Sequence, residues 1–252
     1  MEVSFPADGH EACFRVEDDS FWFTHRNACI LAALKREGVG GPLVDVGGGN
    51  GVVSLALQRA GIETVLVEPG PAGAENARRR GLTNVICAPL DEAGLAPASF
   101  PSAGLFDVAE HVADDAALLA DVRQILRQDG VLCVTVPAHA WLWSDEDELA
   151  GHHRRYTLRS LSDTLSATGF QVRYATYFFA PLTAPVFVLR SLRRRIGRRS
   201  VEVVAKGAER QHVTDALTRR AIQAALAPEV LWIRAGRRIS VGTSCLAIAR
   251  KT

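Results

Sequence analysis

The stretch Leu43-Val-Asp-Val-Gly-Gly-Gly-Asn-Gly51 decides the fold class. Its first four residues form a short apolar run typical of a buried strand, and Val52 to Arg59 continues with helical spacing. Glycines between a strand and a helix lack Cβ atoms, so the chain can turn tightly and a ligand can touch the backbone. The N–H groups at the start of the helix then offer hydrogen bonds to polar ligand atoms. The stretch therefore predicts a ligand-binding strand–loop–helix unit.

Strands and helices alternate along the rest of the chain. Further strands are predicted at 64–67, 84–88, 103–107, 131–136, 170–179 and 241–249. Further helices are predicted at 10–38, 72–80, 114–129, 157–169 and, with breaks at Pro181, Pro185 and Pro228, at 180–236. This alternation predicts a parallel sheet covered on both faces. Right-handed crossovers and short loops then favour a doubly wound α/β fold.

A chain of 252 residues is long enough for one domain with a sizeable core. We expect a single domain over residues 1–252. Its expected parts are an N-terminal helical cap at 10–40, a core at 43–179, a helical insertion or lid at 180–236 and a final strand at 240–250.

Charge and composition argue against several classes of protein. The formal net charge is +1, so no global field attracts nucleic acid. No run reaches roughly 18 apolar residues, and no basic stretch followed by an apolar one opens the chain, so neither a membrane span nor a signal peptide is expected. The five cysteines form no CxxC pair, which favours reduced thiols in a cytoplasmic protein.

The glycine loop also limits the choice of cofactor. A dinucleotide fingerprint that began at Gly47 and Gly49 would need a third glycine where Val52 stands. A phosphate-binding Walker loop would need Gly-Lys-Ser/Thr, and the sequence lacks it here. An NAD-dependent oxidoreductase is therefore the least favoured class of enzyme.

The stretch from Asp45 to Gly51 resembles motif I of class I S-adenosylmethionine (SAM)-dependent methyltransferases. Leu105-Phe-Asp-Val-Ala-Glu-His-Val112 resembles the end of that family's fourth strand, and 129–137 resembles its fifth strand. Phe100-Pro101 departs from the Phe-Asp that relatives often carry, outside the expected pocket. The resemblance implies a Rossmann-like sheet of seven strands, mostly parallel with an antiparallel last strand, and it implies SAM as cofactor with S-adenosylhomocysteine (SAH) as product.

The resemblance also assigns residues to the cofactor. Glu68 ends the second strand, where a carboxylate can accept hydrogen bonds from both ribose hydroxyls at once. Asp91 could accept from the adenine amine. Residues 21–27 resemble a helix of relatives in which Arg26 would bind the methionine carboxylate and Trp22 or Phe23 would cover the sulfonium, although a simply packed helix is the alternative. The full expected set is Asp45, Gly47, Gly49, Gly51, Glu68, Pro69, Leu90, Asp91, Asp107, Arg26 and Trp22.

Two histidines are candidates for the base that removes a proton from a hydroxyl acceptor. His111 follows the fourth strand, with Asp107 and Glu110 beside it. His152 lies in Gly151-His-His-Arg-Arg-Tyr-Thr157, which resembles a G-H-x-R-R-Y-T motif in bacterial methyltransferases of glycans or polyketide sugars. For either histidine, a purely structural hydrogen-bonding role is the alternative.

The segments around these histidines predict the acceptor. Aromatic rings beside charged groups suit the apolar faces and hydroxyl edges of a sugar. The expected substrate residues are Glu110, His139, Trp141, Trp143, Arg154, Arg155 and Tyr156. A divalent metal held by Asp145, Asp147 and a histidine stays an alternative, although the spacing does not indicate one.

We therefore hypothesise an O-methyltransferase acting on a small-molecule or carbohydrate hydroxyl. The alternatives are an N- or C-methyltransferase and, from another class, a SAM-binding subunit without turnover. A nucleic-acid substrate is disfavoured, because Asp107-Val-Ala-Glu110 stands where N-P-P-[YF] would be expected. Residues 177–199 combine apolar runs with arginines, which suits either peripheral membrane contact or a core helix with a basic end. A homodimer is left open.

Overall fold

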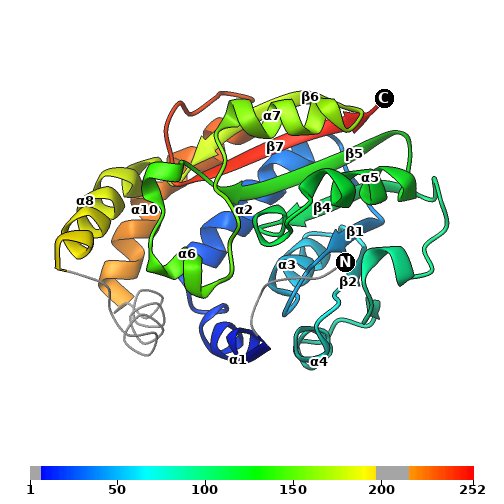
Figure 1. Ribbon diagram of the computed structural model, residues 1–252, viewed down its shortest axis with the longest axis horizontal. Coiled ribbons are helices and arrows are strands. Elements are labelled where there is room, and N and C mark those ends of the chain that lie inside the picture. The colour runs from blue at the N-terminus through cyan, green and yellow to red at the C-terminus, as the bar shows by residue number, and fades with distance from the viewer. Residues whose placement is uncertain (1–6, 197–215) are drawn as a thin grey trace.

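A computed structural model describes residues 7–196 and 216–252 of the chain. Within them, one seven-stranded sheet has the order β3-β2-β1-β4-β5-β7-β6 (Figure 1). Its strands are β1 (Leu43–Val46), β2 (Thr64–Val67), β3 (Val85–Ile86), β4 (Phe100–Phe106), β5 (Leu126–Pro137), β6 (Phe170–Phe178) and β7 (Ser244–Lys251). β7 runs antiparallel to both of its neighbours, whereas the pairs among β1 to β5 are parallel. The predicted fold is confirmed.

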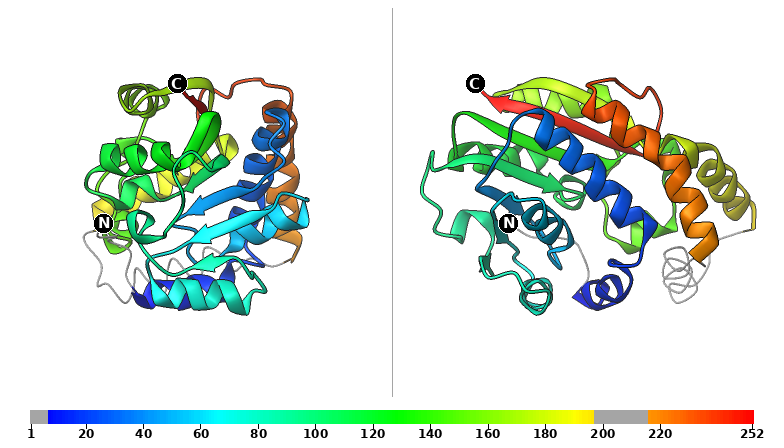
Figure 2. Two further views of the ribbon diagram at one scale, coloured as in Figure 1. Left: turned by 90° about the vertical axis from the view of Figure 1, so that its right-hand side faces the viewer. Right: turned by 180° about the vertical axis from the view of Figure 1, so that it is seen from behind.

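Helices pack on both faces of the sheet, as Figure 2 shows from two sides. They are α1 (Ala7–Val16), α2 (Phe21–Arg36), α3 (Val52–Arg59), α4 (Pro71–Arg79), α5 (Asp115–Ile125), α6 (Asp145–Leu149), α7 (Leu158–Ala167), α8 (Ala180–Ile196) and α10 (Ala216–Arg234). Buried side chains of α5 and α7 form one core with the sheet, and those of α2, α3 and α10 form another. None of the described helices is long and apolar enough to cross a membrane.

The strand order places a crevice beside the glycine loop. From β1 the chain winds outward through β2 to β3, and it then returns to place β4 on the other side of β1. In open α/β sheets, ligands bind at the carboxyl ends of the strands where the order reverses in this way. The loop 47–51 after β1 and Asp107 after β4 both lie at that point.

The N-terminal cap consists of two helices, so the prediction of one helix over 10–38 was wrong. α1 ends at Val16, and α2 begins after Ser20, whose side-chain oxygen accepts a hydrogen bond from the Trp22 N–H over 3.2 Å. A serine in this position satisfies an otherwise unpaired amide and starts a new helix. The break lets α1 turn over the glycine loop while α2 stays packed on the sheet.

Two of the three predicted proline breaks were also wrong. Pro185 lies inside α8 and Pro228 inside α10. Leu226 and Ile233, on either side of Pro228, are fully buried, so packing outweighs the hydrogen bond that proline removes. Pro181 lies in the first turn of α8, where amides lack intrahelical partners in any case. The predicted helix between 197 and 215 falls outside the described residues.

Gly51 makes the turn into α3 possible, so its replacement should destabilise the fold. Its φ is +77°, and a Cβ there would overlap the side chain of Leu82. We expect Gly51→Ala to lower the free energy of unfolding by about 2–4 kcal/mol in urea titrations, from left-handed strain plus overpacking. The matched control is Gly61→Ala, because Gly61 has a φ of +85° but open space around it. Equal losses in the two variants would remove the packing argument.

Candidate functional site

A cavity of about 440 Å³ opens beside the glycine loop, and we name it the glycine-loop cavity. The elements around it are α1, α2, the loops after β1 and β2, and the end of β4. Its lining residues are His10, Cys13, Glu17, Phe23, Arg26, Asp45, Gly47, Gly48, Gly49, Asn50, Val52, Val53, Glu68, Pro69, Gly70, Phe106, Asp107, Val108 and His111.

The loop presents its backbone to this cavity. Gly47 and Gly49 have φ angles of +68° and +52°, which favour glycine. A Cβ on Gly47 would come within 2.9 Å of Val108, so the crossing of the loop over the strand end needs glycine. The space next to Gly49 is open, since the nearest atom to a Cβ there is His10 Cε1 at 4.0 Å. A ligand can therefore approach the backbone closely at Gly49.

Glu68 is held in place by two backbone amides. Gly49 N–H donates to its Oε2 over 2.9 Å, and Gly70 N–H donates to its Oε1 over 2.7 Å. The side chain is buried at the end of β2. Burial raises the pKa of this carboxyl, and the two amides partly offset the rise. The carboxylate is thus preorganised, with lone pairs left for hydroxyl donors in the cavity.

Two further groups in the cavity carry unsatisfied polar atoms. Asp45 accepts from Ser54 Oγ over 2.7 Å, but its buried Oδ1 has no partner among the described residues. Burial raises the pKa of Asp45 to about 6. Arg26 donates from Nη1 to Asp107 Oδ2 over 2.5 Å, and its buried Nε likewise lacks a described partner. Both residues line the glycine-loop cavity, and this pair of opposite charges suits a ligand that carries both charges.

Helix α1 and the residue after it cover the cavity from outside, as the predicted N-terminal cap, through contacts that no local pattern indicates. His10, Cys13 and Glu17 line the cavity. Asn50 Nδ2 donates to the His10 carbonyl over 2.8 Å, and Arg80 donates to Glu17 over 2.9 Å. Burial lowers the pKa of His10 and raises that of Glu17. These contacts join segments that are far apart in the chain, so local patterns could not reveal them.

A second cavity of about 340 Å³ adjoins the first, and we name it the histidine cavity. Its lining residues are Trp22, Phe23, Arg26, Asp107, Glu110, His111, Pro137, Glu146, Ala150, His152, Arg155, Val186, Leu189, Arg190, Thr243 and Ser244. Four of these also line the glycine-loop cavity: Phe23, Arg26, Asp107 and His111. These four side chains are therefore part of the wall between the two cavities.

His152 and Asp147 form an oriented pair in the histidine cavity. Asp147 Oδ1 lies 2.8 Å from His152 Nδ1, and Arg155 also donates to Asp147. These partners hold the pKa of the Asp147 carboxyl well below its usual range, against the opposing effect of burial. Asp147 is therefore ionised and fixes Nδ1 as the donor, so that the lone pair of the neutral ring lies on Nε2. The ring of His111 lies edge-on to that of His152, with the ring centroids 4.6 Å apart.

The comparisons with known proteins agree with this architecture. A family model described as a methyltransferase domain matches residues 23–175, more than half of the chain. The chain belongs to this methyltransferase family. Its seven-stranded sheet makes it a class I SAM-dependent methyltransferase. A comparison with curated protein sequences gave no match.

Solved structures share the fold at low sequence identity. An S-adenosylmethionine-dependent methyltransferase from Mesorhizobium loti is 18% identical, with 93% of this chain and 100% of that chain covered and a TM-score of 0.58. A chain of the Haloferax volcanii complex between the Trm112 methyltransferase activator and a methyltransferase is 16% identical, with 99% and 97% covered and a TM-score of 0.64. The [4+2]-cyclase SpnF is 18% identical, with 89% and 80% covered and a TM-score of 0.57.

The glycine-loop cavity of the methyltransferase fits SAM. The amino-acid end of SAM carries an ammonium and a carboxylate, which match the carboxyl group of Asp45 and the guanidinium of Arg26 in the cavity lining. Its ribose offers two adjacent hydroxyls, which match the oriented carboxylate of Glu68. The open approach to Gly49 suits backbone contact with the cofactor.

The methyltransferase structure places the predicted cofactor residues in three groups. Asp45, Gly47, Gly49, Glu68, Pro69, Asp107 and Arg26 line the glycine-loop cavity. Gly51 shapes the loop from behind, and Trp22 lines the histidine cavity, where it stacks on Phe179 with a centroid distance of 3.9 Å. Leu90 and Asp91 lie on a short 3-10 turn (Leu90–Glu92) outside both linings, with Leu90 buried in the core and Asp91 exposed.

The predicted substrate residues divide between the histidine cavity and its surroundings. Glu110 and Arg155 line it. Burial and the neighbouring Asp107 raise the pKa of Glu110 well above its ordinary value. Outside both linings lie His139, Trp141, Trp143, Arg154 and Tyr156. His139 stacks between Trp141 and Tyr177, while Arg154 and Tyr156 are both bound to Asp115.

Metal binding through Asp145 and Asp147 has little support in the geometry. Asp147 already accepts from Ser144, His152 and Arg155, which leaves its oxygens engaged. Another group in the histidine cavity offers one ligand atom each from Glu110, His111 and His152, all within 4.8 Å of one another. Of the two groups, this second one is better placed to hold a divalent ion.

The burial of His111 predicts a pH-dependent stability. Desolvation, followed by the effect of His152, lowers the pKa of His111 to about 3. Between about pH 6.5 and 3, His111 is therefore protonated in the unfolded chain but neutral in the folded protein. The free energy of unfolding consequently falls as the pH falls. We expect the advantage of the wild type over His111→Gln to shrink by about 1.4 kcal/mol per pH unit in urea unfolding below about pH 6.5. A pH-independent difference would contradict this.

Proposed function

We propose that the methyltransferase O-methylates a hydroxyl group of a small molecule or carbohydrate bound in the histidine cavity. One observation carries the proposal. His152, oriented by Asp147, lines a cavity that shares four wall residues with the cavity that fits SAM. A hydroxyl must lose its proton as it is methylated, so a positioned base beside the methyl donor supports O-methylation.

The roles follow from the contacts. Asp45, Glu68, Arg26 and the glycine loop would hold the cofactor, whose sulfonium supplies the methyl group. His152 Nε2 takes the hydroxyl proton, and the ionised Asp147 stabilises the imidazolium that forms. His111 lies between the cavities and stays neutral near pH 7, because its pKa is lowered. His111 therefore serves as an uncharged wall, and His152 is the favoured base.

The character of the histidine cavity supports a polyhydroxylated acceptor. Polar and charged groups from Glu110, Glu146, Arg155 and Arg190 face it, next to the apolar surfaces of Trp22, Val186 and Leu189. Arg190 pairs with Glu146 over 3.1 Å, which leaves no strong net charge to select an ionic acceptor. Hydroxyl edges and an apolar ring face match this mixture.

The test is a screen for SAH formation with purified enzyme, SAM and two matched panels. One panel holds glycosides and polyketide alcohols, and the other holds primary and secondary amines. Turnover in the first panel is expected. Turnover with amines alone would replace the proposal by N-methylation, as in the phosphoethanolamine N-methyltransferase of Haemonchus contortus that shares the fold. SAM binding without turnover in either panel would favour a non-catalytic subunit, since this fold also serves a cyclase.

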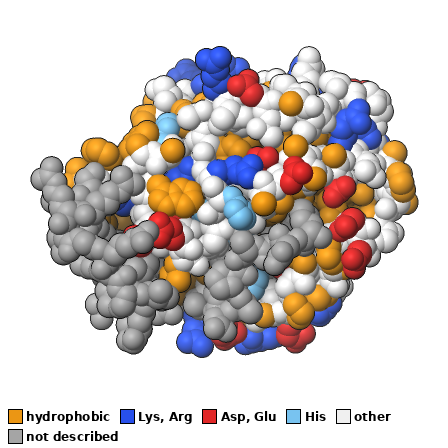
Figure 3. All heavy atoms as spheres, in the orientation of Figure 1, with side chains coloured by type: hydrophobic (Ala, Val, Ile, Leu, Met, Phe, Trp, Pro, Cys, Tyr) orange, Lys and Arg blue, Asp and Glu red, His pale blue; other side chains and the backbone are white. Residues whose placement is uncertain are grey.

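We also propose that α8 makes peripheral contact with a membrane beside the acceptor entrance. Phe187, Val188 and Leu189 are about half exposed, as is Trp141, which packs on Phe187 with the centroids 5.3 Å apart. Hydrophobic side chains gather over this region in Figure 3. Leu189 also lines the histidine cavity, so the apolar surface continues into the site. The arginines from 193 to 199 that prompted the hypothesis have side chains outside the described structure.

The membrane proposal predicts a loss of vesicle binding. We expect the Phe187→Ser/Val188→Ser double variant to cosediment with anionic phospholipid vesicles roughly tenfold more weakly than the wild type, because two apolar side chains no longer insert. Leu217→Ser on α10, also exposed, is the control. Unchanged sedimentation would contradict membrane contact at this face. If the wild type forms dimers and only the double variant disrupts them, a second copy of the chain would be favoured as the occupant of this face.

A further inference from the structure

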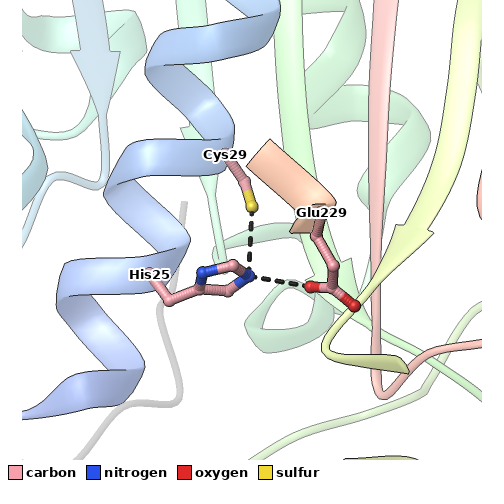
Figure 4. A group of neighbouring side chains, drawn as sticks. All are labelled: His25, Cys29 and Glu229. Carbon is pink, nitrogen blue, oxygen red and sulfur yellow. Dashed lines mark hydrogen bonds and ion pairs between the residues drawn. The ribbon is translucent and has the colours of Figure 1, made fainter. Parts of the chain in front are cut away.

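A buried group of three ligand-type side chains lies between α2 and α10, and none of the three belongs to the lining of either cavity. His25 and Cys29 are one turn apart on α2, and Glu229 approaches from α10 (Figure 4). Cys29 Sγ lies 3.4 Å from His25 Nε2, which lies 2.8 Å from Glu229 Oε2. All three residues are at most 6% exposed. We call these three residues the α2–α10 cluster.

The ligand atoms of this cluster meet around one ring nitrogen. A ring nitrogen has either one N–H or one lone pair, yet His25 Nε2 meets both the thiol and the carboxylate. If Nε2 donates to Glu229, it offers no lone pair to the Cys29 thiol. If it accepts, then two acidic groups compete for one lone pair. One possible ligand atom from each of the three residues lies within 4.8 Å of the other two, a spacing that suits a bound cation.

The surroundings of Glu229 resemble a supporting shell for such a cation. Its Oε2 accepts from Phe179 N–H over 2.8 Å, and its Oε1 accepts from Ala180 N–H over 2.6 Å. The ring of Phe179 packs against His25 with the centroids 5.0 Å apart. Backbone amides and packed rings of this kind fix the orientation of ligands around a metal. The carboxylate is therefore held towards His25 before any ion binds.

We propose that His25, Cys29 and Glu229 form a site for a divalent metal, with Zn²⁺ as the ion it suits best. Thiolate, imidazole and carboxylate together are ligands that zinc accepts in tetrahedral geometry. The Sγ–Nε2 distance of 3.4 Å is close to the roughly 3.5 Å between two such ligands of zinc. The Nε2–Oε2 distance would lengthen by roughly half an ångström, and a water molecule would complete the four ligands.

Binding converts the Cys29 thiol to a thiolate and releases its proton to solvent. Burial raises the pKa of this thiol, so the free site holds the proton firmly and should gain affinity for the metal as the pH rises. The ion would join α2 and α10 at the start of α8. Because α2 carries Trp22 and Arg26, it would also fix a wall of both cavities. Metal binding here does not depend on the acceptor or on O-methylation.

The experiment measures metal content and the spectrum of the cobalt-substituted protein. The full chain is expressed with added zinc, purified without chelators and analysed by mass spectrometry for metals. We expect roughly one zinc ion per wild-type chain. Exchange for Co²⁺ should produce a thiolate-to-cobalt charge-transfer band and the intense visible bands of four-coordinate cobalt. Cys29→Ser should lose the charge-transfer band and most of the zinc.

Cys245→Ser is the matched control, because Cys245 is an equally buried cysteine that belongs to no ligand group among the described residues. It should keep both the zinc and the band. A wild type that takes up no stoichiometric zinc overturns the proposal, as does a Cys29→Ser variant that keeps it. The latter result would direct attention to Glu110, His111 and His152, which offer no thiolate. Glu229→Gln is a second test, because it should also lower the zinc content. If Glu229→Gln does not fold, the result for Cys29→Ser decides alone.

Discussion

Replacing Glu68 by Gln is expected to weaken the binding of both SAM and SAH by roughly 100-fold, or about 3 kcal/mol. Gln has the same shape, so the cavity keeps its volume. Its amide group, however, must turn an NH₂ towards either the Gly49 or the Gly70 amide, both of which donate to the present carboxylate. A favourable contact thus becomes a clash between two donors, and the charge that would bind two ribose hydroxyls is lost.

Calorimetric titration with SAM and with SAH measures the effect without any knowledge of the acceptor. Glu75→Gln on α4 is the control, because its exposed carboxylate is 3.9 Å from Arg78 and outside the cavity lining. That variant should bind both ligands as the wild type does. If Glu68→Gln bound SAM within roughly threefold of the wild type, the assignment of the glycine-loop cavity to the ribose would fail. An NAD titration in parallel tests the dinucleotide alternative.

The sequence predicted the centre of the sheet well because the relevant signals are local. Apolar strands, a glycine-rich turn and an acid at a strand end each follow from a few neighbouring residues. The carboxyl ends of parallel strands meet at one edge, so the sequence alone indicates that Gly49 and Glu68 lie together, and the two are hydrogen-bonded. Asp91 shows the limit of these local signals. It was expected beside the adenine of the cofactor, but it lies exposed on the 3-10 turn after β3.

Contacts between distant segments explain what the sequence could not reveal. Helix α1 and Glu17, the residue after it, cover the glycine-loop cavity through Asn50 and Arg80, and no pattern within residues 7–17 indicates either partner. The α2–α10 cluster joins positions 204 residues apart. The loop after β5 is an intermediate case. Its sequence drew attention to Trp141 and His152 equally, but His139 adopts a φ of +61° and stacks on Trp141 outside the cavity, whereas Asp147 holds His152 inside it.

His152→Ala is expected to lower kcat by roughly 100- to 10,000-fold with a hydroxyl acceptor, which is the usual contribution of a general base. The acceptor is the one identified by the SAH screen. Binding of SAH should stay within roughly twofold of the wild type, because His152 lines only the histidine cavity. A loss of kcat without a loss of cofactor binding separates a role in proton removal from a role in folding.

His153→Ala is the matched control, since His153 is the exposed neighbour of His152 and its backbone N–H, which the substitution keeps, donates to the Glu110 carbonyl over 2.7 Å. It should keep the wild-type kcat. The comparison with His111→Gln then assigns the base. His111 has a strongly lowered pKa and lines both cavities, so its loss should weaken SAH binding as well as turnover. If His111→Gln abolished turnover while His152→Ala left it intact, the proton would leave through His111, and the pairing of His152 with Asp147 would be structural.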